Sequence, residues 1–182
     1  FTDSKDIDRL VLVKVAEAER DYERAFFFAT SKKDYDTRGK ELIRKKVITQ
    51  EALKKAVIEE FVTGAQVNFN FFYSPLTKEL ELVGTDMRRQ TNVDGILRLP
   101  ADEQLKLLEY EKPKYIETGH IAVTVKESLL EKAYEAGMNF VKATQKHYPP
   151  GILGPFALQG AILAGPPKEE LIVFDVSMRI PG

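Results

Sequence analysis

The 182-residue sequence contains no cysteine and no tryptophan, and its only histidines are His120 and His147. Without cysteine the chain has no disulfide, no thiolate zinc site and no cysteine nucleophile. A lone histidine is a weak signal, so we expect both to be structural or solvent-exposed rather than catalytic. The sequence also lacks a glycine-rich Walker loop, a GxSxG motif and an HExxH motif.

An excess of charge of one sign is absent as well. Lys and Arg total 27 and Asp and Glu total 28, a net charge of −1. This balance argues against general binding to nucleic acid or to an anionic membrane. No apolar run approaches the roughly 18 residues that span a bilayer, and no signal peptide is visible. We therefore expect a cytoplasmic protein without nucleic-acid or membrane partners.

Apolar and alternating runs predict many strands with a few helices between them. Ser31 and Thr49 are N-cap signals for helices that reach Lys45 and Lys55, and Pro100 opens a short helix. The longest helix carries apolar positions from Leu129 to Thr144. The predicted strands cover 10–15, 25–29, 56–62, 66–73, 79–83, 116–125, 153–163 and 171–176.

The order of these elements predicts an α+β fold with mostly antiparallel strands. We expect 56–62 and 66–73 to form a hairpin with one packed face, carrying Val67 and Phe69, and one polar face, carrying Asn68 and Asn70. The polar segment 86–94 is expected to be irregular.

The two terminal strands carry a candidate metal site. Gln159 lies in one strand and Asp175 in the next, and Arg179 follows in step with Asp175. Magnesium prefers oxygen ligands, usually one or two from the protein together with phosphates. On spacing alone, however, an ordinary exposed strand face is the better interpretation.

Other candidate residues also leave two interpretations open. Lys14, inside an apolar strand, reaches solvent or meets an anion, which is either a phosphate or a neighbouring glutamate. The pair Glu59 and Glu60 binds a ribose or a metal, or simply solvates a strand edge. Two arginines and an asparagine in the segment 86–94 form a candidate phosphate- or amide-binding patch, namely Arg88, Arg89 and Asn92.

Taken in order, these motifs resemble a known family. A VxVK strand, the stretch VIEEFVTG and a terminal DVSxR strand are similar to the ATP-grasp arrangement. The segments VIEEFVTGAQVNFNFFYSPL, ELELVGTDMRRQTNVDGILRLPADEQL, ESLLEKAYEAGMNFV and YPPGILGPFALQG resemble the archaeal PurP family, the formate-dependent 5-formaminoimidazole-4-carboxamide ribonucleotide (FAICAR) synthetases of purine biosynthesis.

The resemblance implies an ATP-grasp fold of antiparallel sheets with flanking helices. Residues 1–62 would be part of the nucleotide-binding subdomain and residues 63–182 the catalytic and metal-binding subdomain. A Rossmann-like N-terminal lobe would lie outside this sequence, which we expect to be part of a longer chain. The family also implies a homo-oligomer.

The resemblance further implies an ATP- and magnesium- or manganese-dependent ligase that formylates AICAR ribonucleotide with formate, through formyl phosphate. Its site residues would fall into four groups. These are Lys14, Glu59, Glu60 and Val62 for ATP; Arg88, Arg89 and Asn92 for the ribonucleotide; Gln159 and Asp175 for the metal; and Arg179 for phosphate charge in catalysis.

A second hypothesis is a nucleotide-binding homologue without catalytic activity, or a paralogue with a different activity. It is motivated by the acidic, glycine-free stretch Ala16–Arg24, where PurP proteins carry glycines. Acidic side chains there would repel a triphosphate unless they point away from it.

Overall fold

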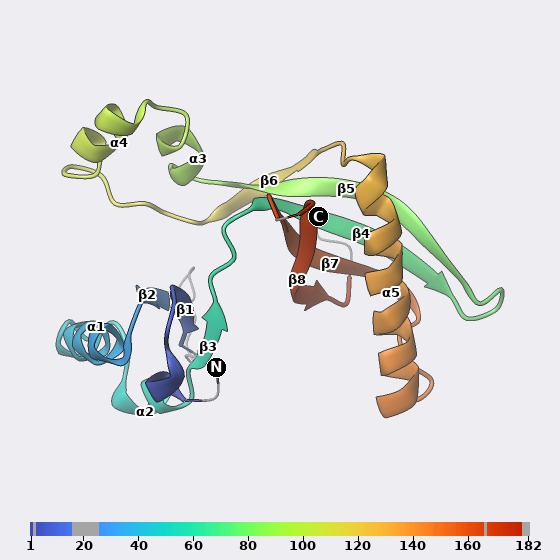
Figure 1. The fold of residues 1–182 in the computed structure, drawn as a ribbon, viewed down its shortest axis with the longest axis horizontal. Coiled ribbons are helices and arrows are strands. Elements are labelled where there is room, and N and C mark those ends of the chain that lie inside the picture. Colours follow the sequence, from blue (N-terminus) through green and yellow to red (C-terminus); the bar gives the residue numbers. More distant parts are fainter. Residues whose placement is uncertain (2, 16–25, 166, 180–182) are drawn as a thin grey trace. The chain divides into compact units, whose positions relative to one another are not determined.

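The computed structural model describes residues 1, 3–15, 26–165 and 167–179. The chain divides into two compact units, Phe1–Phe61 and Val62–Gly182, both drawn in Figure 1. The stretch Ala16–Arg24, which motivates the non-catalytic hypothesis, lies outside the described residues. Each unit has its own sheet and its own hydrophobic core.

The first unit is built on a three-stranded antiparallel sheet in the order β2-β1-β3. Ser31 and Thr49 cap its two α-helices as predicted: their hydroxyl oxygens accept hydrogen bonds from the backbone N–H groups of Asp34 and Ala52. The elements are a 3₁₀-helix at Ser4–Asp6, β1 Val11–Lys14, β2 Phe26–Ala29, α1 Lys32–Arg44, α2 Gln50–Lys54 and β3 Val57–Glu60.

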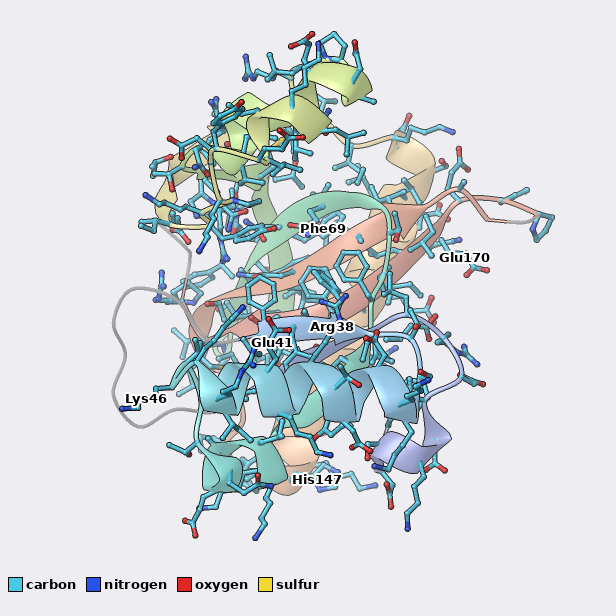
Figure 2. All side chains as sticks on the ribbon, turned by 90° about the vertical axis from the view of Figure 1, so that its left-hand side faces the viewer. Arg38, Glu41, Lys46, Phe69, His147 and Glu170 are labelled. Atoms are coloured by element: carbon cyan, nitrogen blue, oxygen red, sulfur yellow. The ribbon has the colours of Figure 1, made fainter. Side chains whose placement is uncertain are left out.

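Alternation along β1 decides which side chains this unit buries. Val11 and Val13 are fully buried, and the partly buried Tyr35 and Leu42 of α1 pack against the same core. Lys14 lies on the other face of β1, because successive strand residues point to opposite sides. The solvent side of α1 carries charged residues, among them Arg38 and Glu41 (Figure 2).

The second unit is built on a five-stranded antiparallel sheet in the order β6-β5-β4-β7-β8. The long helix α5 packs over one face of this sheet, and two short helices lie in the connection between β5 and β6 (Figure 1). The elements are β4 Ala65–Ser74, β5 Glu79–Gln90, α3 Val93–Ile96, α4 Ala101–Leu107, β6 Glu117–Ala122, α5 Glu127–His147, β7 Gly154–Leu163 and β8 Glu170–Ser177.

Aromatic side chains from neighbouring strands form the centre of this core. Phe69, Phe71 and Phe156 are completely buried, and the rings of Phe71 and Phe156 stack with centroids 5.4 Å apart. Helix α5 approaches them closely at Gly137, where an added Cβ would lie 3.2 Å from Phe71 Cζ. The predicted packed face of 66–73 is therefore confirmed, and the mixed α/β architecture with antiparallel sheets agrees with the sequence prediction.

Two predictions about local structure are wrong. The segments 56–62 and 66–73 do not form a hairpin, because β3 pairs with β1 whereas β4 pairs with β5 and β7. The residues Asp86–Gln90 are not irregular but form the second half of β5. This part of β5 has polar side chains that pair with other polar side chains on neighbouring strands. It therefore lacks the alternation of apolar and polar residues from which a strand is predicted. Of the helices that the structure describes, none has the length and apolar character needed to span a membrane.

Candidate functional site

A row of polar residues crosses the face of the five-stranded sheet that points away from α5. Asp86 on β5 pairs with Asn68 on β4, Asn68 pairs with Gln159 on β7, and Gln159 pairs with Asp175 on β8. These residues alternate with the core residues of the same strands, so their side chains share the opposite face. We call this surface the polar face; it also includes Asn70 and Arg88, defined by the same alternation.

The Asp86 carboxylate is the centre of a hydrogen-bond network on the polar face. Its Oδ1 accepts from Asn68 Nδ2 at 2.7 Å, and its Oδ2 accepts from Asn70 Nδ2 at 2.5 Å. His120 Nδ1, on β6, lies 2.5 Å from the same Oδ1. An ionised carboxylate only accepts hydrogen bonds, so all three partners must present a donor to it.

The network continues from His120 toward Gln159. His120 Nε2 lies 3.1 Å from Glu117 Oε1, so both ring nitrogens face carboxylates and the imidazolium form fits this environment. Arg88 Nε pairs with Glu117 Oε2 at 2.8 Å, and Arg88 Nη2 donates to Gln159 Oε1 at 3.5 Å. Charged and polar groups from four strands are thus connected.

Burial and hydrogen bonding act in opposite directions on the two central groups. Burial alone would raise the pKa of the Asp86 carboxyl, but hydrogen bonds from His120, Asn68 and Asn70 outweigh it and hold that pKa below its usual range. Burial alone would lower the pKa of the His120 imidazole, but hydrogen bonds to Asp86 and Glu117 outweigh it and raise that pKa. Both shifts favour the charged pair.

The predicted metal ligands Gln159 and Asp175 are direct cross-strand partners, so the structure brings them together. Gln159 is buried, whereas Asp175 is exposed. An amide oxygen and a carboxylate are both oxygen donors that suit magnesium or manganese. Among the described residues no group of three or more His, Cys, Asp and Glu side chains could hold a metal. An ion held by this pair would therefore need phosphate or water oxygens as well, and the donor set fits that arrangement.

A β-bulge next to Gln159 shapes this pair. The register between β7 and β8 shifts between Gln159 and Gly160. At Gly160 the two strands come so close that an added Cβ would lie 2.8 Å from the backbone oxygen of Ile172. Glycine at this position therefore keeps β8, which carries Asp175, close beside β7.

The predicted ATP residues of the first unit are paired with each other or with neighbours. Lys14 Nζ lies 2.6 Å from Glu59 Oε2, so the structure shows the glutamate partner that the sequence left as one of two interpretations. Glu60 lies on the opposite face of β3 and pairs with Arg9 at 3.5 Å. Val62 is the first residue of the second unit.

The predicted substrate residues do not form one patch. Arg89 points to the other face of β5 from Arg88, and its Nε donates to Asp94 Oδ2 at 2.9 Å. Asn92 donates to the Lys112 carbonyl at 2.9 Å, and its side-chain oxygen accepts from the Lys114 N–H at 2.7 Å. These two bonds close the base of the connection that carries α3 and α4.

Arg179, predicted to act on phosphate charge, lies two residues beyond the end of β8 and is exposed. Its position along the chain continues the strand that carries Asp175.

Sequence reasoning missed most of the network on the polar face. The sequence pattern predicts only a polar strand face for Asn68 and Asn70, yet each is 6% exposed. The signal available was two asparagines at period two within a strongly apolar strand, which predicts buried amides that need partners. Asp86, Glu117 and His120 had no local signal, because their pairing depends on the strand order.

Comparison with known proteins adds a family assignment. A family model described as a domain of unknown function, DUF1297, matches residues 34–182. That match covers most of the chain. This chain belongs to the DUF1297 family.

Several curated relatives of this DUF1297 chain carry the name 5-formaminoimidazole-4-carboxamide-1-(beta)-D-ribofuranosyl 5'-monophosphate synthetase. The protein of Methanocaldococcus jannaschii is 37% identical over 182 residues, which is 100% of this chain and 48% of the relative. The protein of Methanothermobacter thermautotrophicus is 36% identical with the same coverage. The predicted resemblance to PurP is confirmed, and the chain spans about half the length of the relatives that it matches.

A solved structure also shows similarity to PurP. The IMP biosynthesis protein PurP from Thermococcus kodakaraensis superposes with a TM-score of 0.56 and 33% sequence identity. The match covers 69% of this chain and 38% of that chain. The mixed α/β architecture of this DUF1297 chain is therefore similar to that of PurP.

Proposed function

We propose that this DUF1297 chain is the ATP-grasp catalytic portion of a FAICAR synthetase, and that the complete protein formylates AICAR ribonucleotide with formate and ATP. The observation that carries the proposal is the direct pairing of Gln159 with Asp175, which creates an oxygen-donor pair on the polar face. The names of the relatives supply the reaction class.

The reaction that we propose has two steps. A formate oxygen attacks the γ-phosphorus of ATP and the bond to ADP breaks, giving formyl phosphate. The amine nitrogen of the ribonucleotide then attacks the formyl carbon, the carbon–oxygen bond to phosphate breaks, and the amine loses a proton. This chemistry depends on positioning and charge stabilisation rather than on a protein nucleophile, so the absence of cysteine is no obstacle.

In this proposal Gln159 and Asp175 hold Mg²⁺ or Mn²⁺, which would supply charge neutralisation at the ATP phosphates. Arg88 keeps the Gln159 side chain in place through its bond to Oε1. Arg179 adds positive charge near the same strand end. Arg89 and Asn92 remain candidates for contact with the ribonucleotide.

The ion pair in the first unit suggests how ATP is received. Lys14 forms an ion pair with Glu59. We propose that Lys14 turns to the triphosphate when ATP binds, which frees the Glu59 carboxylate to accept a hydrogen bond from a ribose hydroxyl. Glu60 and the backbone near Val62 would complete the adenosine contacts. Cytoplasmic location and a homo-oligomer follow from the same proposal.

The test is a product assay on the complete protein with ATP, Mg²⁺, formate and AICAR ribonucleotide. The proposal predicts ADP and FAICAR in equal amounts. It also predicts that Asp175→Asn abolishes turnover, whereas Glu170→Gln, an exposed carboxylate on the same strand (Figure 2), leaves turnover unchanged. If neither ADP nor FAICAR forms while the control reactions are active, the proposal is overturned. Magnesium-dependent ATP binding without turnover would support the non-catalytic hypothesis.

A further inference from the structure

One buried acceptor on the polar face has no partner. Asn70 is 6% exposed, and its Nδ2 donates to Asp86. Its Oδ1 is buried and is one of three described side-chain atoms of this kind that make no hydrogen bond within the chain. Buried polar atoms in folded proteins nearly always have a partner, so an exception calls for a physical reason.

The orientation of this amide is imposed by Asp86. A carboxylate accepts and never donates, so each asparagine must turn its NH₂ group toward Asp86. The nitrogen and oxygen of an amide lie on opposite sides of the group, and the Asn70 oxygen therefore faces away from the carboxylate. His120 donates to the same carboxylate and holds it in place.

The cross-strand neighbours of Asn70 are small and cannot pair with its oxygen. They are Gly84 on β5 and Ala157 on β7, neither of which carries a side-chain donor. A Cβ added at Gly84 would meet no atom within 4 Å. Asn70 lies two residues along β4 from Asn68, whose partner is Gln159, and two residues span about 7 Å of strand.

We propose that Asp86 is a positioning residue that presents the Asn70 amide oxygen to an N–H or O–H donor of the carboxamide nucleotide substrate. The inference rests on the proposed function and names the part of the substrate that this position receives. The Asn70 amide oxygen only accepts hydrogen bonds, and an ionised phosphate oxygen has no proton to donate, so this position receives a donor group such as an amine or a carboxamide. The ATP phosphates, whose charge the proposed metal ion would neutralise, belong at the other end of the row, beside Asp175.

Steady-state kinetics of the complete protein test this role. Asp86→Asn forces one of the two asparagines to turn over, because an amide in place of the carboxylate donates as well as accepts. The KM for the nucleotide should rise about tenfold, the loss expected for one hydrogen bond, while the KM for ATP stays within about twofold. Asn70→Ala should have the same effect. Glu169→Gln, which removes a partly exposed carboxylate that is ion-paired with Lys126, is the matched control and should change neither constant.

A double-variant cycle separates positioning from mere structural support. If Asp86 acts through Asn70, the double variant Asp86→Asn/Asn70→Ala should be no worse than either single variant. Effects that multiply, or a nucleotide KM that Asp86→Asn leaves unchanged, would overturn the inference. Asn70→Ala leaves the pair of Asp86 with His120 in place and removes only the proposed substrate contact. Should Asp86→Asn fail to fold, Asn70→Ala alone must therefore raise the nucleotide KM, and an unchanged KM would overturn the inference.

A ligand-free measurement keeps the inference separate from the proposed function. If the wild-type complete protein shows no turnover, the proposed function fails. The side-chain ¹⁵NH₂ signals of Asn68 and Asn70 can still be followed by NMR in the complete protein. Wild type should show both amides bound to a carboxylate, and Asp86→Asn should shift the signals of at least one of them. Unchanged amide signals in a folded Asp86→Asn variant would overturn the role assigned to Asp86.

Discussion

Strand β4 carries the core on one face and the polar face on the other, so two adjacent phenylalanines should respond very differently to truncation. Phe71 is completely buried, stacks on Phe156 and makes an edge contact with Tyr134 at 5.9 Å. Phe72, the next residue, is 40% exposed. We expect Phe71→Ala to lower the free energy of unfolding of the second unit by about 3–5 kcal/mol.

The matched variant Phe72→Ala should cost about 1–2 kcal/mol, because much of its ring already meets water and no closed cavity forms. Urea unfolding followed by circular dichroism measures both, with hydrogen exchange of β4 amides to assign the loss to the second unit. The exchange data matter because two units need not unfold in one transition. Equal losses for the two variants, or a larger loss for Phe72→Ala, would refute the assignment of the two faces.

Further predictions concern the network, the bulge and the ATP contact. The pKa of His120 is raised in the folded chain, so the stability that its protonation contributes is complete below about pH 6.5 and is lost as pH rises through the folded pKa. Urea unfolding from pH 6 upward should show this loss of stability in wild type and not in His120→Asn. Gly160→Ala should push β8 away from β7 and destabilise the second unit by about 1–3 kcal/mol. It should also weaken Mn²⁺ binding, measured by titration in the presence of ATP. The control Gly95→Ala, whose added Cβ meets nothing within 4 Å, should leave Mn²⁺ binding unchanged. Lys14→Met should weaken ATP binding by the complete protein about 10- to 100-fold in calorimetry. The control Lys45→Met, at the exposed end of α1, should leave the affinity for ATP within about twofold of wild type. Equal effects of the two variants would contradict the proposed contact between Lys14 and the ATP phosphates.

Local signals predicted the parts of this fold that depend on local physics. The capping side chains of Ser31 and Thr49 bind neighbouring N–H groups, so the short sequence around them is sufficient. The packed face of β4 followed from alternation alone. The pairing of β3 with β1 did not, because strand order is decided by contacts between distant segments.

In the candidate site, too, some residues could be predicted from the local sequence and others depend on the strand order. Gln159 and Asp175 could be placed on adjacent strands because the short connection between β7 and β8 makes them a hairpin. Asp86 and His120 are 34 residues apart in the chain, and each looks ordinary by itself. Only the pairing of β5 with β6 brings them together, and the polar second half of β5 gave no hydrophobic pattern to indicate a strand.

The most direct test of the proposed chemistry follows oxygen from formate. When the complete protein acts on AICAR ribonucleotide, ATP and ¹⁸O-labelled formate, the formyl phosphate route leaves one formate oxygen on phosphate. Mass spectrometry of the inorganic phosphate should therefore show one ¹⁸O per molecule of FAICAR formed. Phosphate without label, alongside FAICAR production, would contradict the proposed phosphorylation of formate beside Gln159 and Asp175.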